Sequence, residues 1–397
     1  MFGVMSFEPL RGIRVVDLTS SLAGPTCTEI LAALGAEVIK VEHPGRGDEA
    51  RAWGPPFFDG GSVLFFAANR SKRSLALDLK EPRGREALLR LVDGADVFAQ
   101  SMRAGTAERQ GLGSSALRAR NKRLVYCSIG AFGQAGPLAQ QPGYDPLMQA
   151  FAGLISITGE ADRPGVRVGA SVVDIGTGVW AALGVVAALH ERTTTGIGRD
   201  VDVTLLDTAL SLVAYQLTAT LASGVAPGRF GTAFPLIAPY EVFATADGEL
   251  MIAAANDGLF RQFCERIGLP AMADDPRFAT NPDRLAHRDE LLPPIRARLA
   301  ERPSGEWLQV LEGIPVTEVQ DLAGVARHEQ VRAVGMVGEI GGVETVGVPL
   351  RIDGERLAHD TGPPTLGRHS AEVLAELGYS DAEIATLVAE GVVVSST

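Results

Sequence analysis

Cysteine, aromatic residues and metal-binding patterns are sparse in this 397-residue sequence. Its three cysteines, Cys27, Cys127 and Cys264, stand far apart and form no CxxC pair. This excludes a disulfide-stabilised scaffold and a zinc ribbon, and it favours a reducing compartment. The six histidines show no metal-ligand spacing, and the sequence has no GxxxxGK[ST], GxSxG or HExxH motif. We therefore expect neither a serine hydrolase nor a zinc hydrolase.

The sequence also has few positively charged residues relative to acidic ones, and few long hydrophobic runs. Lys and Arg number 36 against 48 Asp and Glu, which gives a net charge of −12. A general nucleic-acid-binding protein needs a basic face, so no nucleic-acid partner is expected. The longest apolar run, 175–189, has 15 residues, whereas a membrane span needs about 20. No targeting signal precedes the first strand, and we expect a cytoplasmic protein without a membrane partner.

Strand and helix signals alternate along the first half of the sequence. Strands are predicted at 13–19, 36–42, 74–79, 95–100 and 124–129, and helices at 25–34 and 82–92. Pro25 suits the first turn of its helix, and Gly35 suits the end. This alternation predicts an α/β fold with a parallel sheet covered on both faces. Lys40, near the end of a strand, is expected to extend its charged end into solvent.

The middle of the sequence changes character. Helices are predicted at 144–153, 176–191 and 207–223, with a short strand at 200–205. A segment rich in Gly, Pro and Ala, 223–239, indicates a linker. A hairpin-like pair, 240–244 and 249–254, and amphipathic helices at 258–268 and 286–312 then predict a second, α+β unit. Strand and turn signals return from about 331, and the sequence ends in a predicted helix at 370–377.

A glycine pattern in the middle of the sequence could indicate a dinucleotide-binding site. The segment 176–181 matches GxGxxA, which occurs in nicotinamide-binding sheets. The acidic residue expected about 20 positions later falls on Asp200 or Asp202, before or early in a strand instead of at its end. We therefore expect no nicotinamide cofactor. A dinucleotide-dependent oxidoreductase stays open as a lower alternative.

Asp174 stands between an apolar stretch and this apolar helix. One interpretation is structural: an aspartate commonly caps a helix N-terminus. The other is functional. Free N–H groups would keep the carboxylate ionised, and Gly176 and Gly178 would let a bulky substrate approach. Such a carboxylate can attack an activated acyl group.

Several segments together resemble the class III CoA-transferases, the group of formyl-CoA transferase, the carnitine CoA-transferase relatives and α-methylacyl-CoA racemase. The resemblance covers nearly the whole sequence. The segments are 10–19, 23–25, 34–42, 77–80, 143–145, 149–153, 158–159, Asp174, 195–207, 313–315 and 366–374.

The resemblance implies an acyl-CoA:carboxylate CoA-transferase in which Asp174 attacks the thioester and then carries CoA as an aspartyl-CoA thioester. Its substrates would be an acyl-CoA and a free carboxylic acid, with coenzyme A as the group transferred and no metal. Contacts to CoA are implied for a set of residues in the first half of the sequence. They are Leu22, Ala23, His43, Leu77, Lys80, Ser101, Met102, Arg103, Arg109, Tyr144 and Asp145.

Among the departures from the relatives that the sequence resembles, three bear on the substrate and the reaction. His43 replaces the arginine of the formyl-CoA enzyme, which weakens that contact at neutral pH. Leu22 replaces a glutamine, which suggests a more apolar acyl group and makes oxalate and formate poor substrates. Tyr144 replaces the racemase histidine and is a poor proton acceptor, so transfer is favoured over 2-methylacyl-CoA racemisation or epimerisation. A non-catalytic acyl-CoA-binding protein is a further alternative.

The resemblance also implies a fold. Residues 1–222 and 336–397 would form a Rossmann-like large α/β domain, and 240–312 a smaller α+β domain. Linkers at 223–239 and 313–335 would join them. Two such chains would make an interlinked homodimer.

Overall fold

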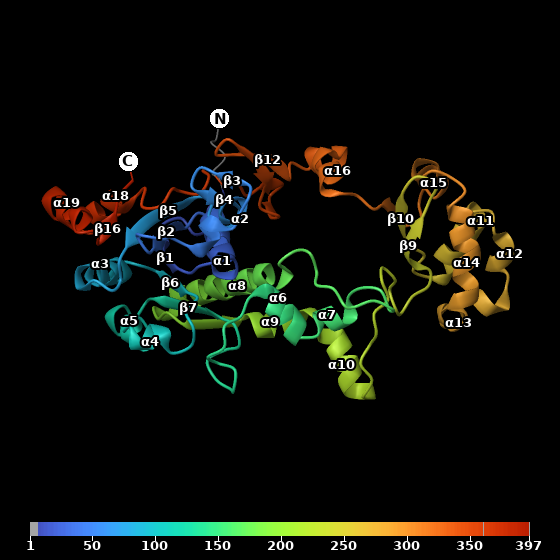
Figure 1. Cartoon of the computed structure of the whole chain (residues 1–397), viewed down its shortest axis with the longest axis horizontal. Coiled ribbons are helices and arrows are strands. Elements are labelled where there is room, and N and C mark those ends of the chain that lie inside the picture. The colour runs from blue at the N-terminus through green and yellow to red at the C-terminus, as the bar shows by residue number, and fades with distance from the viewer. Residues whose placement is uncertain (1–6, 360, 397) are drawn as a thin grey trace. The chain divides into compact units, whose positions relative to one another are not determined.

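The computed structural model describes residues 7–359 and 361–396 (Figure 1). The chain divides into two compact units. The first contains the described parts of Met1–Leu154, Val168–Ala222 and Gln330–Thr397, and the second contains Ile155–Arg167 and Ser223–Glu329. The boundaries differ from those predicted, because 155–167 and most of both expected linkers belong to the second unit.

The first unit is built on a seven-stranded sheet. Its strands are β1 (Arg14–Leu18), β2 (Glu37–Glu42), β5 (Lys72–Leu77), β6 (Val97–Gln100), β7 (Val125–Gly130), β8 (Asp200–Thr204) and β16 (Val393–Val394). The order is β16-β5-β2-β1-β6-β7-β8, and only β16 is antiparallel to its neighbour. The six parallel strands run 3-2-1-4-5-6 in chain order, which is typical of doubly wound sheets. Ligands of such sheets bind where the order reverses, here between β1 and β6.

The first unit also contains helices. They are α1 (Ala23–Ala33), α2 (Val63–Ala68), α3 (Pro82–Asp93), α4 (Thr106–Arg109), α5 (Ser114–Arg120), α6 (Asp145–Phe151), α8 (Val172–Thr195), α9 (Leu205–Leu212), α10 (Ala214–Ser223), α17 (Glu329–Ala333), α18 (Ser370–Glu376) and α19 (Asp381–Ala389). Short elements complete the unit: η1 (Glu49–Ala52), β3 (Phe57–Phe58), β4 (Gly61–Ser62), and the hairpins β12 (Val337–Ile340) with β13 (Val343–Val346) and β14 (Arg351–Ile352) with β15 (Glu355–Arg356).

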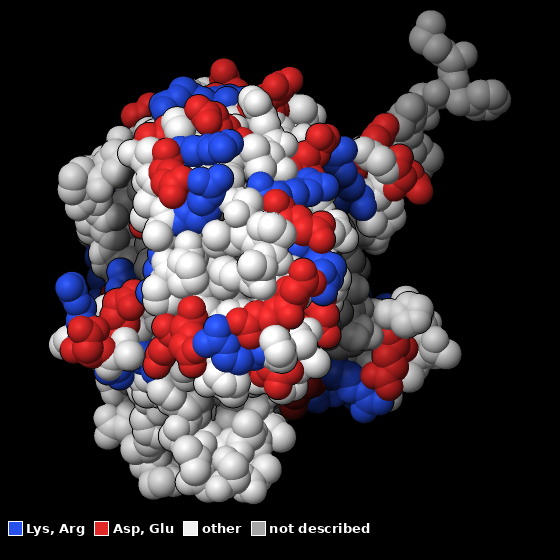
Figure 2. Space-filling view, turned by 90° about the vertical axis from the view of Figure 1, so that its right-hand side faces the viewer, with Lys and Arg blue, Asp and Glu red and all other residues white. Residues whose placement is uncertain are grey.

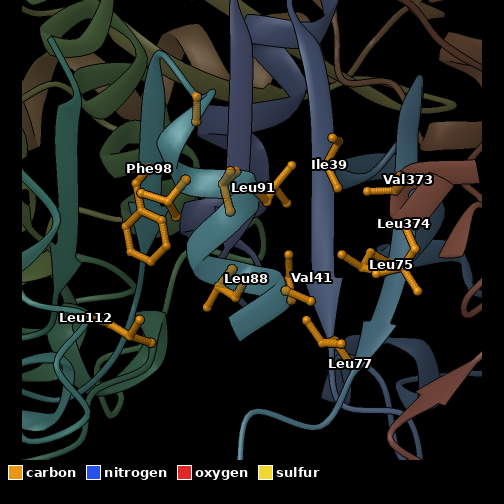
Figure 3. Packing of buried hydrophobic residues seen from close by; sticks show 14 of the residues in the cluster. Ile39, Val41, Leu75, Leu77, Leu88, Leu91, Phe98, Leu112, Val373 and Leu374 are labelled. Atoms are coloured by element: carbon orange, nitrogen blue, oxygen red, sulfur yellow. The ribbon is translucent and has the colours of Figure 1, made fainter. Parts of the chain in front are cut away.

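A hydrophobic core lies against one face of the sheet (Figure 3). Leu88 and Leu91 of α3 pack there with Ile39 of β2, and all three side chains are buried. Val373 and Leu374 of α18 join the same cluster. The C-terminal segment is therefore part of the core built by the N-terminal strands, since β16 also pairs with β5.

The second unit has its own core. A three-stranded antiparallel sheet, β9 (Tyr240–Ala244), β10 (Glu249–Ala253) and β11 (Val316–Glu318), packs with helices. These are α11 (Asp257–Arg266), α12 (Pro270–Ala273), η2 (Pro276–Phe278), α13 (Asn281–Ala286), α14 (Arg288–Leu299), α15 (Ser304–Val310) and α16 (Leu322–Arg327); α7 (Leu154–Ile157) runs across the boundary between the units. Trp307 is buried in this core, and its indole N–H donates to the carbonyl of Leu299 at 2.8 Å.

The predicted strands of the large sheet are observed with shifts of about two residues at their ends. The predictions are wrong where a single predicted helix is broken into two. The predicted helix 207–223 is two helices, α9 and α10, bent by 71°. The predicted helix 286–312 is divided into two helices, α14 and α15, and Pro303 is the N-cap residue of α15. The sequence also continues past the predicted last helix into α19, whose capping box joins Ser380 and Glu383.

Two surface properties bear on the expected partners. In the described part of the chain, α8 is the one helix that is long and apolar enough to cross a membrane, and the bent pair α9–α10 would qualify as a unit. One side of α8 packs against α1 and is buried, whereas Ile175, Val179, Trp180 and Leu183 on another side are exposed. On the face shown in Figure 2, Lys and Arg are interspersed with Asp and Glu.

Candidate active site

A cavity of about 420 Å³ opens in the first unit where the strand order reverses. Its walls come from the loops that follow β1, β6 and β7 and from the start of α8. The backbone N–H of Ser20 donates to Ser101 Oγ at 3.0 Å and so joins the loops after β1 and β6. The lining residues are Ser20, Ser21, Ala23, Gly24, Glu49, Ser101, Met102, Arg103, Ala104, Ile129, Gly130, Ala131, Gly133, Gln134, Ala139, Gln141, Pro142, Gly143, Tyr144, Asp174 and Leu205.

A buried ion pair holds the loop after β1. Lys40 Nζ lies 2.9 Å from Asp48 Oδ2 and donates to the carbonyl of Thr19 at 2.9 Å. Asp48 Oδ1 accepts the N–H of Ser21, whose φ of 71° is unusual for a serine. The expectation that Lys40 extends into solvent is wrong, because its side chain is fully buried with two partners. The pair fixes the serines that line the cavity.

A second buried pair lies at the end of β1. Asp17 Oδ2 is 3.1 Å from Lys72 Nζ and accepts from Thr28 Oγ1 at 2.6 Å. Burial alone would raise the pKa of Asp17, but the charges of Lys72 and Lys40 hold it well below its usual range. Burial lowers the pKa of Lys72 to about 8, against the attraction of Asp17. Asp17 Oδ1 also accepts the N–H of Thr19, so this pair anchors the same loop.

Asp174 lies inside the first turn of α8 and does not cap it. The helix begins at Val172, four residues before the predicted start, and Ser171 at its N-cap makes no side-chain hydrogen bond. The cap comes from α6: Asp145 Oδ2 accepts the N–H groups of Val173 at 2.7 Å and Asp174 at 3.2 Å. Asp145, which is 1% exposed, therefore occupies the N–H groups that were predicted to be free.

The electrostatics of Asp174 follow from this arrangement. Burial, and then the nearby carboxylate of Asp145, raise the pKa of Asp174 to about 7. The expectation that free N–H groups keep Asp174 ionised is thus wrong. Within the described residues, the Asp174 carboxylate forms no hydrogen bond or ion pair, and it faces the cavity. An unpaired carboxyl group of raised basicity is suited to act as a nucleophile.

The two glycines after Asp174 serve helix packing. A Cβ on Gly178 would lie 2.8 Å from the carbonyl oxygen of Ala23 and 2.7 Å from Thr26 Cβ. A Cβ on Gly176 would lie 3.0 Å from Thr208 Cγ2. The glycines let α1 and α9 approach α8, so the expectation that they admit substrate is wrong. The GxGxxA segment lies within a helix and not at a strand–helix turn, which removes the basis for a dinucleotide fingerprint.

The structure brings together part of the expected CoA-binding set. Ala23, Ser101, Met102, Arg103 and Tyr144 line the cavity with Asp174. Arg103 is the only cationic side chain that lines it within the described residues, and it forms no ion pair there.

The other expected contacts lie outside the cavity wall. Leu77 packs in the hydrophobic core, and Lys80 and Arg109 have exposed side chains. His43 Nδ1 accepts the N–H of Gly45 in the turn after β2. Leu77, Lys80 and His43 lie at or just after the carboxyl ends of β5 and β2, which reach the same sheet edge as the cavity. A long ligand along that edge would meet them.

The predicted contacts of Leu22 and Asp145 with the ligand are not supported, because neither residue lines the cavity. Leu22 does not line the cavity, so its replacement of a glutamine gives no support for an apolar acyl group. The walls carry polar side chains, such as Ser101, Gln134 and Gln141, together with apolar ones, such as Met102 and Ile129. Asp145 lies behind Asp174, away from the cavity wall.

Sequence reasoning missed Glu49. It lines the cavity, and its carboxylate accepts the hydroxyl of Tyr144 at 3.3 Å. The charge of Glu49, followed by burial, raises the pKa of Tyr144 above its usual value. Tyr144 thus keeps its proton near neutral pH, as expected for a poor proton acceptor. The signal available in the sequence was the position of Glu49 soon after a predicted strand.

Other chemistries find little support in the described residues. No group of three or more His, Cys, Asp or Glu side chains in that part of the chain could hold a metal ion. Cys27, Cys127 and Cys264 are all free and buried. The site therefore consists of one unpaired carboxyl group in a cavity lined by both polar and apolar side chains.

Comparison with known proteins decides the family. Residues 10–370 match the family described as CoA-transferase family III. The chain belongs to CoA-transferase family III. It is 39% identical to the succinate–glutarate CoA-transferase of Agrobacterium fabrum, over 93% of this chain and 96% of that protein. It is also 39% identical to the acetyl-CoA:oxalate CoA-transferase of Acetobacter aceti, over 94% of this chain and 97% of that protein.

A solved structure gives the same assignment. The crystal structure of a CaiB/BaiF family protein from Brucella suis is 38% identical, covers 94% of this chain and 100% of that chain, and has a TM-score of 0.85. The predicted family and the predicted acyl-CoA:carboxylate CoA-transferase activity are both confirmed. The substrates of this CoA-transferase include an acyl-CoA and a carboxylic acid.

Proposed function

We propose that Asp174 is the nucleophile of this CoA-transferase. The observation that carries the proposal is its unpaired carboxyl group facing the cavity at the switch point of the sheet. A carboxylate with a pKa near 7 is more basic, and hence a better nucleophile, than an ordinary aspartate. The role of Asp174 also follows from the resemblance to the class III enzymes.

The reaction then proceeds by exchange of acyl bonds. Ionised Asp174 attacks the thioester carbonyl, the C–S bond breaks, and CoA leaves as a thiolate while a mixed anhydride forms. The thiolate attacks the aspartyl carbonyl and expels the first carboxylate, which leaves an aspartyl-CoA thioester. The acceptor carboxylate attacks this thioester and releases the thiolate again. Attack of the thiolate on the acceptor's acyl carbon gives the new acyl-CoA and restores Asp174. Transition states of this type need oriented reactants and hydrogen-bond donors.

We assign CoA binding to the sheet edge on which the cavity opens. Arg103 lines the cavity, and the exposed Lys80 and Arg109 carry positive charge for the phosphates. An acidic protein needs such local cations to hold an anionic ligand.

For the acyl group we propose a short dicarboxylic acid. The relatives named above act on succinate, glutarate or oxalate. Serine and glutamine side chains on the cavity wall can donate hydrogen bonds to a second carboxylate, beside the apolar side chains that share the wall. This proposal replaces the expectation of an apolar acyl group.

Mass spectrometry tests the nucleophile. Wild-type protein incubated with succinyl-CoA should carry a CoA adduct on the peptide that contains Asp174. The Asp174→Asn variant should carry none and should lose transfer by several orders of magnitude. Asp93→Asn, which removes a surface carboxylate paired with Arg120, should behave as wild type. Transfer by Asp174→Asn near the wild-type rate would refute the assignment.

We also propose a homodimer. Four apolar side chains of α8, Ile175, Val179, Trp180 and Leu183, are exposed along one side of the helix, with Trp180 at 52% and Leu183 at 56%. Exposed Phe151 of α6 adds to the apolar surface of this unit. Large exposed apolar areas are typical of subunit interfaces. The interlinked arrangement and the cytoplasmic location stay predictions.

Sedimentation velocity tests the dimer. Wild type should sediment as a dimer, and the double variant Trp180→Glu/Leu183→Glu should sediment as a monomer because two charges cannot be buried unpaired. Val388→Glu on α19 replaces another exposed apolar residue and should remain a dimer. A monomeric wild type would refute the proposal.

A further inference from the structure

Asp145 makes an unusual set of contacts for a residue expected to bind CoA. Its carboxylate is buried, with one oxygen accepting two backbone N–H groups of α8 and the other accepting Gln149 Nε2 at 2.6 Å. Gln149 is itself fully buried, and its Oε1 accepts the N–H of Val168 at 2.8 Å. Through these hydrogen bonds Asp145 and Gln149 together join α6 to the segment that leads into α8 and to the first turn of α8.

These contacts occupy the capping position of α8. The residue before the helix, Ser171, forms no side-chain cap. A helix start leaves its first N–H groups without backbone partners, and a capping side chain contributes roughly 1 kcal/mol to helix stability. Asp145 performs this role from another helix, so it fixes the turn on which Asp174 stands.

We propose that Asp145 is a positioning residue for the Asp174 nucleophile: from α6 it holds the first turn of α8, and it places a second buried carboxylate at the turn that carries Asp174. This inference rests on the proposed function of Asp174. Like charges in one buried site disfavour each other's ionisation, so the charge of Asp145 makes Asp174 more basic. Greater basicity makes the ionised carboxylate a stronger nucleophile, and the cost is that Asp174 must lose its proton near neutral pH.

The surroundings of Asp174 contain few competing charges. On the cavity wall, Glu49 and Arg103 are the other charged side chains. The carboxylates on elements packed against α8 are engaged elsewhere: Glu29 of α1 with Arg70 and His359, Asp207 of α9 with Thr204, Asp200 of β8 with Arg118, and Asp202 of β8 with Ser128. Of these groups, Asp145 alone contributes a charge that raises the pKa of Asp174.

The test separates two effects of Asp145: its negative charge and its hydrogen bonds to the first N–H groups of α8. Asp145→Asn keeps an oxygen that can accept the two N–H groups and removes the charge. We measure the single-turnover rate of CoA-adduct formation on the Asp174 peptide, with succinyl-CoA, between pH 5 and 9. For wild type the rate should rise with pH with a midpoint of about 7. For Asp145→Asn the midpoint should move down by about one pH unit, and the plateau rate should fall.

A control variant and an NMR measurement keep the outcomes distinct. Asp93→Asn removes a surface carboxylate and should leave the midpoint unchanged. An equal midpoint in Asp145→Asn and wild type, with adducts in both, would overturn the inference while Asp174 remains the nucleophile. Absence of any adduct on the wild-type Asp174 peptide would instead refute the proposed function. If Asp145→Asn does not fold, carbon-13 NMR of wild type, with the Asp174 signal assigned by its loss in Asp174→Asn, reports the midpoint directly. An ordinary aspartate midpoint near 4 would contradict the inference.

Discussion

Replacing Gly178 by alanine should destabilise the protein, although alanine is the better helix former. Gly178 lies inside α8, where alanine gains about 1 kcal/mol over glycine. The added Cβ would lie 2.8 Å from a backbone carbonyl oxygen of α1 and 2.7 Å from the branched Cβ of Thr26. Neither neighbour is the end of a flexible side chain, so α1 and α8 must move apart. Overpacking of this kind costs up to about 3 kcal/mol, which leaves a net loss of about 2 kcal/mol.

Thermal unfolding measures this loss. At roughly 2 °C per kcal/mol for a chain of this size, Gly178→Ala should lower the Tm by about 4 °C. The matched control is Gly305→Ala in α15, where a Cβ would have no neighbour within 4 Å. That variant should keep the Tm or raise it. CoA transfer should also slow in Gly178→Ala, because Ala23 and Gly24 at the start of α1 line the cavity. An unchanged or raised Tm for Gly178→Ala would refute the account of α1–α8 packing.

Four further predictions follow from the buried charges and the cavity. Lys72→Met should cost about 3–5 kcal/mol in urea unfolding, because it removes a partner of the buried Asp17 carboxylate; the double variant with Asp17→Asn should recover part of the loss. Arg103→Ala and Lys80→Ala should each raise the KM for acyl-CoA about tenfold with little change in kcat, since phosphate contacts are similar in ground and transition states. Asp174→Asn should stabilise the protein at pH 8, by no more than about 4 kcal/mol, and hardly at all at pH 4. The pKa of Asp174 is about 7 in the folded protein and higher than in the unfolded chain, so the stability of wild type falls as pH rises between these two values. Equal urea midpoints for wild type and Asp174→Asn at pH 8 would contradict this. Finally, NMR in D₂O should show no deuterium entering the α-position of a 2-methylacyl-CoA at a catalytic rate, because Tyr144, which replaces the racemase histidine, keeps its proton near neutral pH; rapid α-deuteration would indicate a racemase.

Local sequence signals determined much of the first unit. Apolar runs predicted its parallel strands, and Pro25 and Gly35 indicated the first helix because their backbone preferences act within one turn. The position of Asp174 beside a glycine-rich apolar helix, with the family resemblance, also predicted the candidate nucleophile. Periodicity failed where a helix breaks without changing its apolar pattern, as between α9 and α10.

Only the tertiary structure decided the state and surroundings of these residues. Asp145 and Asp174 are 29 positions apart, and their contact depends on how α6 packs beside α8. That contact reverses the expected charge behaviour of Asp174, since the N–H groups that would stabilise its ionised form bind another carboxylate. Lys40 is buried because Asp48 and Thr19 come together around it. Gly178 serves packing because α1 approaches it. A sequence specifies which groups are present, whereas pKa values, burial and close contacts depend on neighbours that only folding brings within a few ångströms.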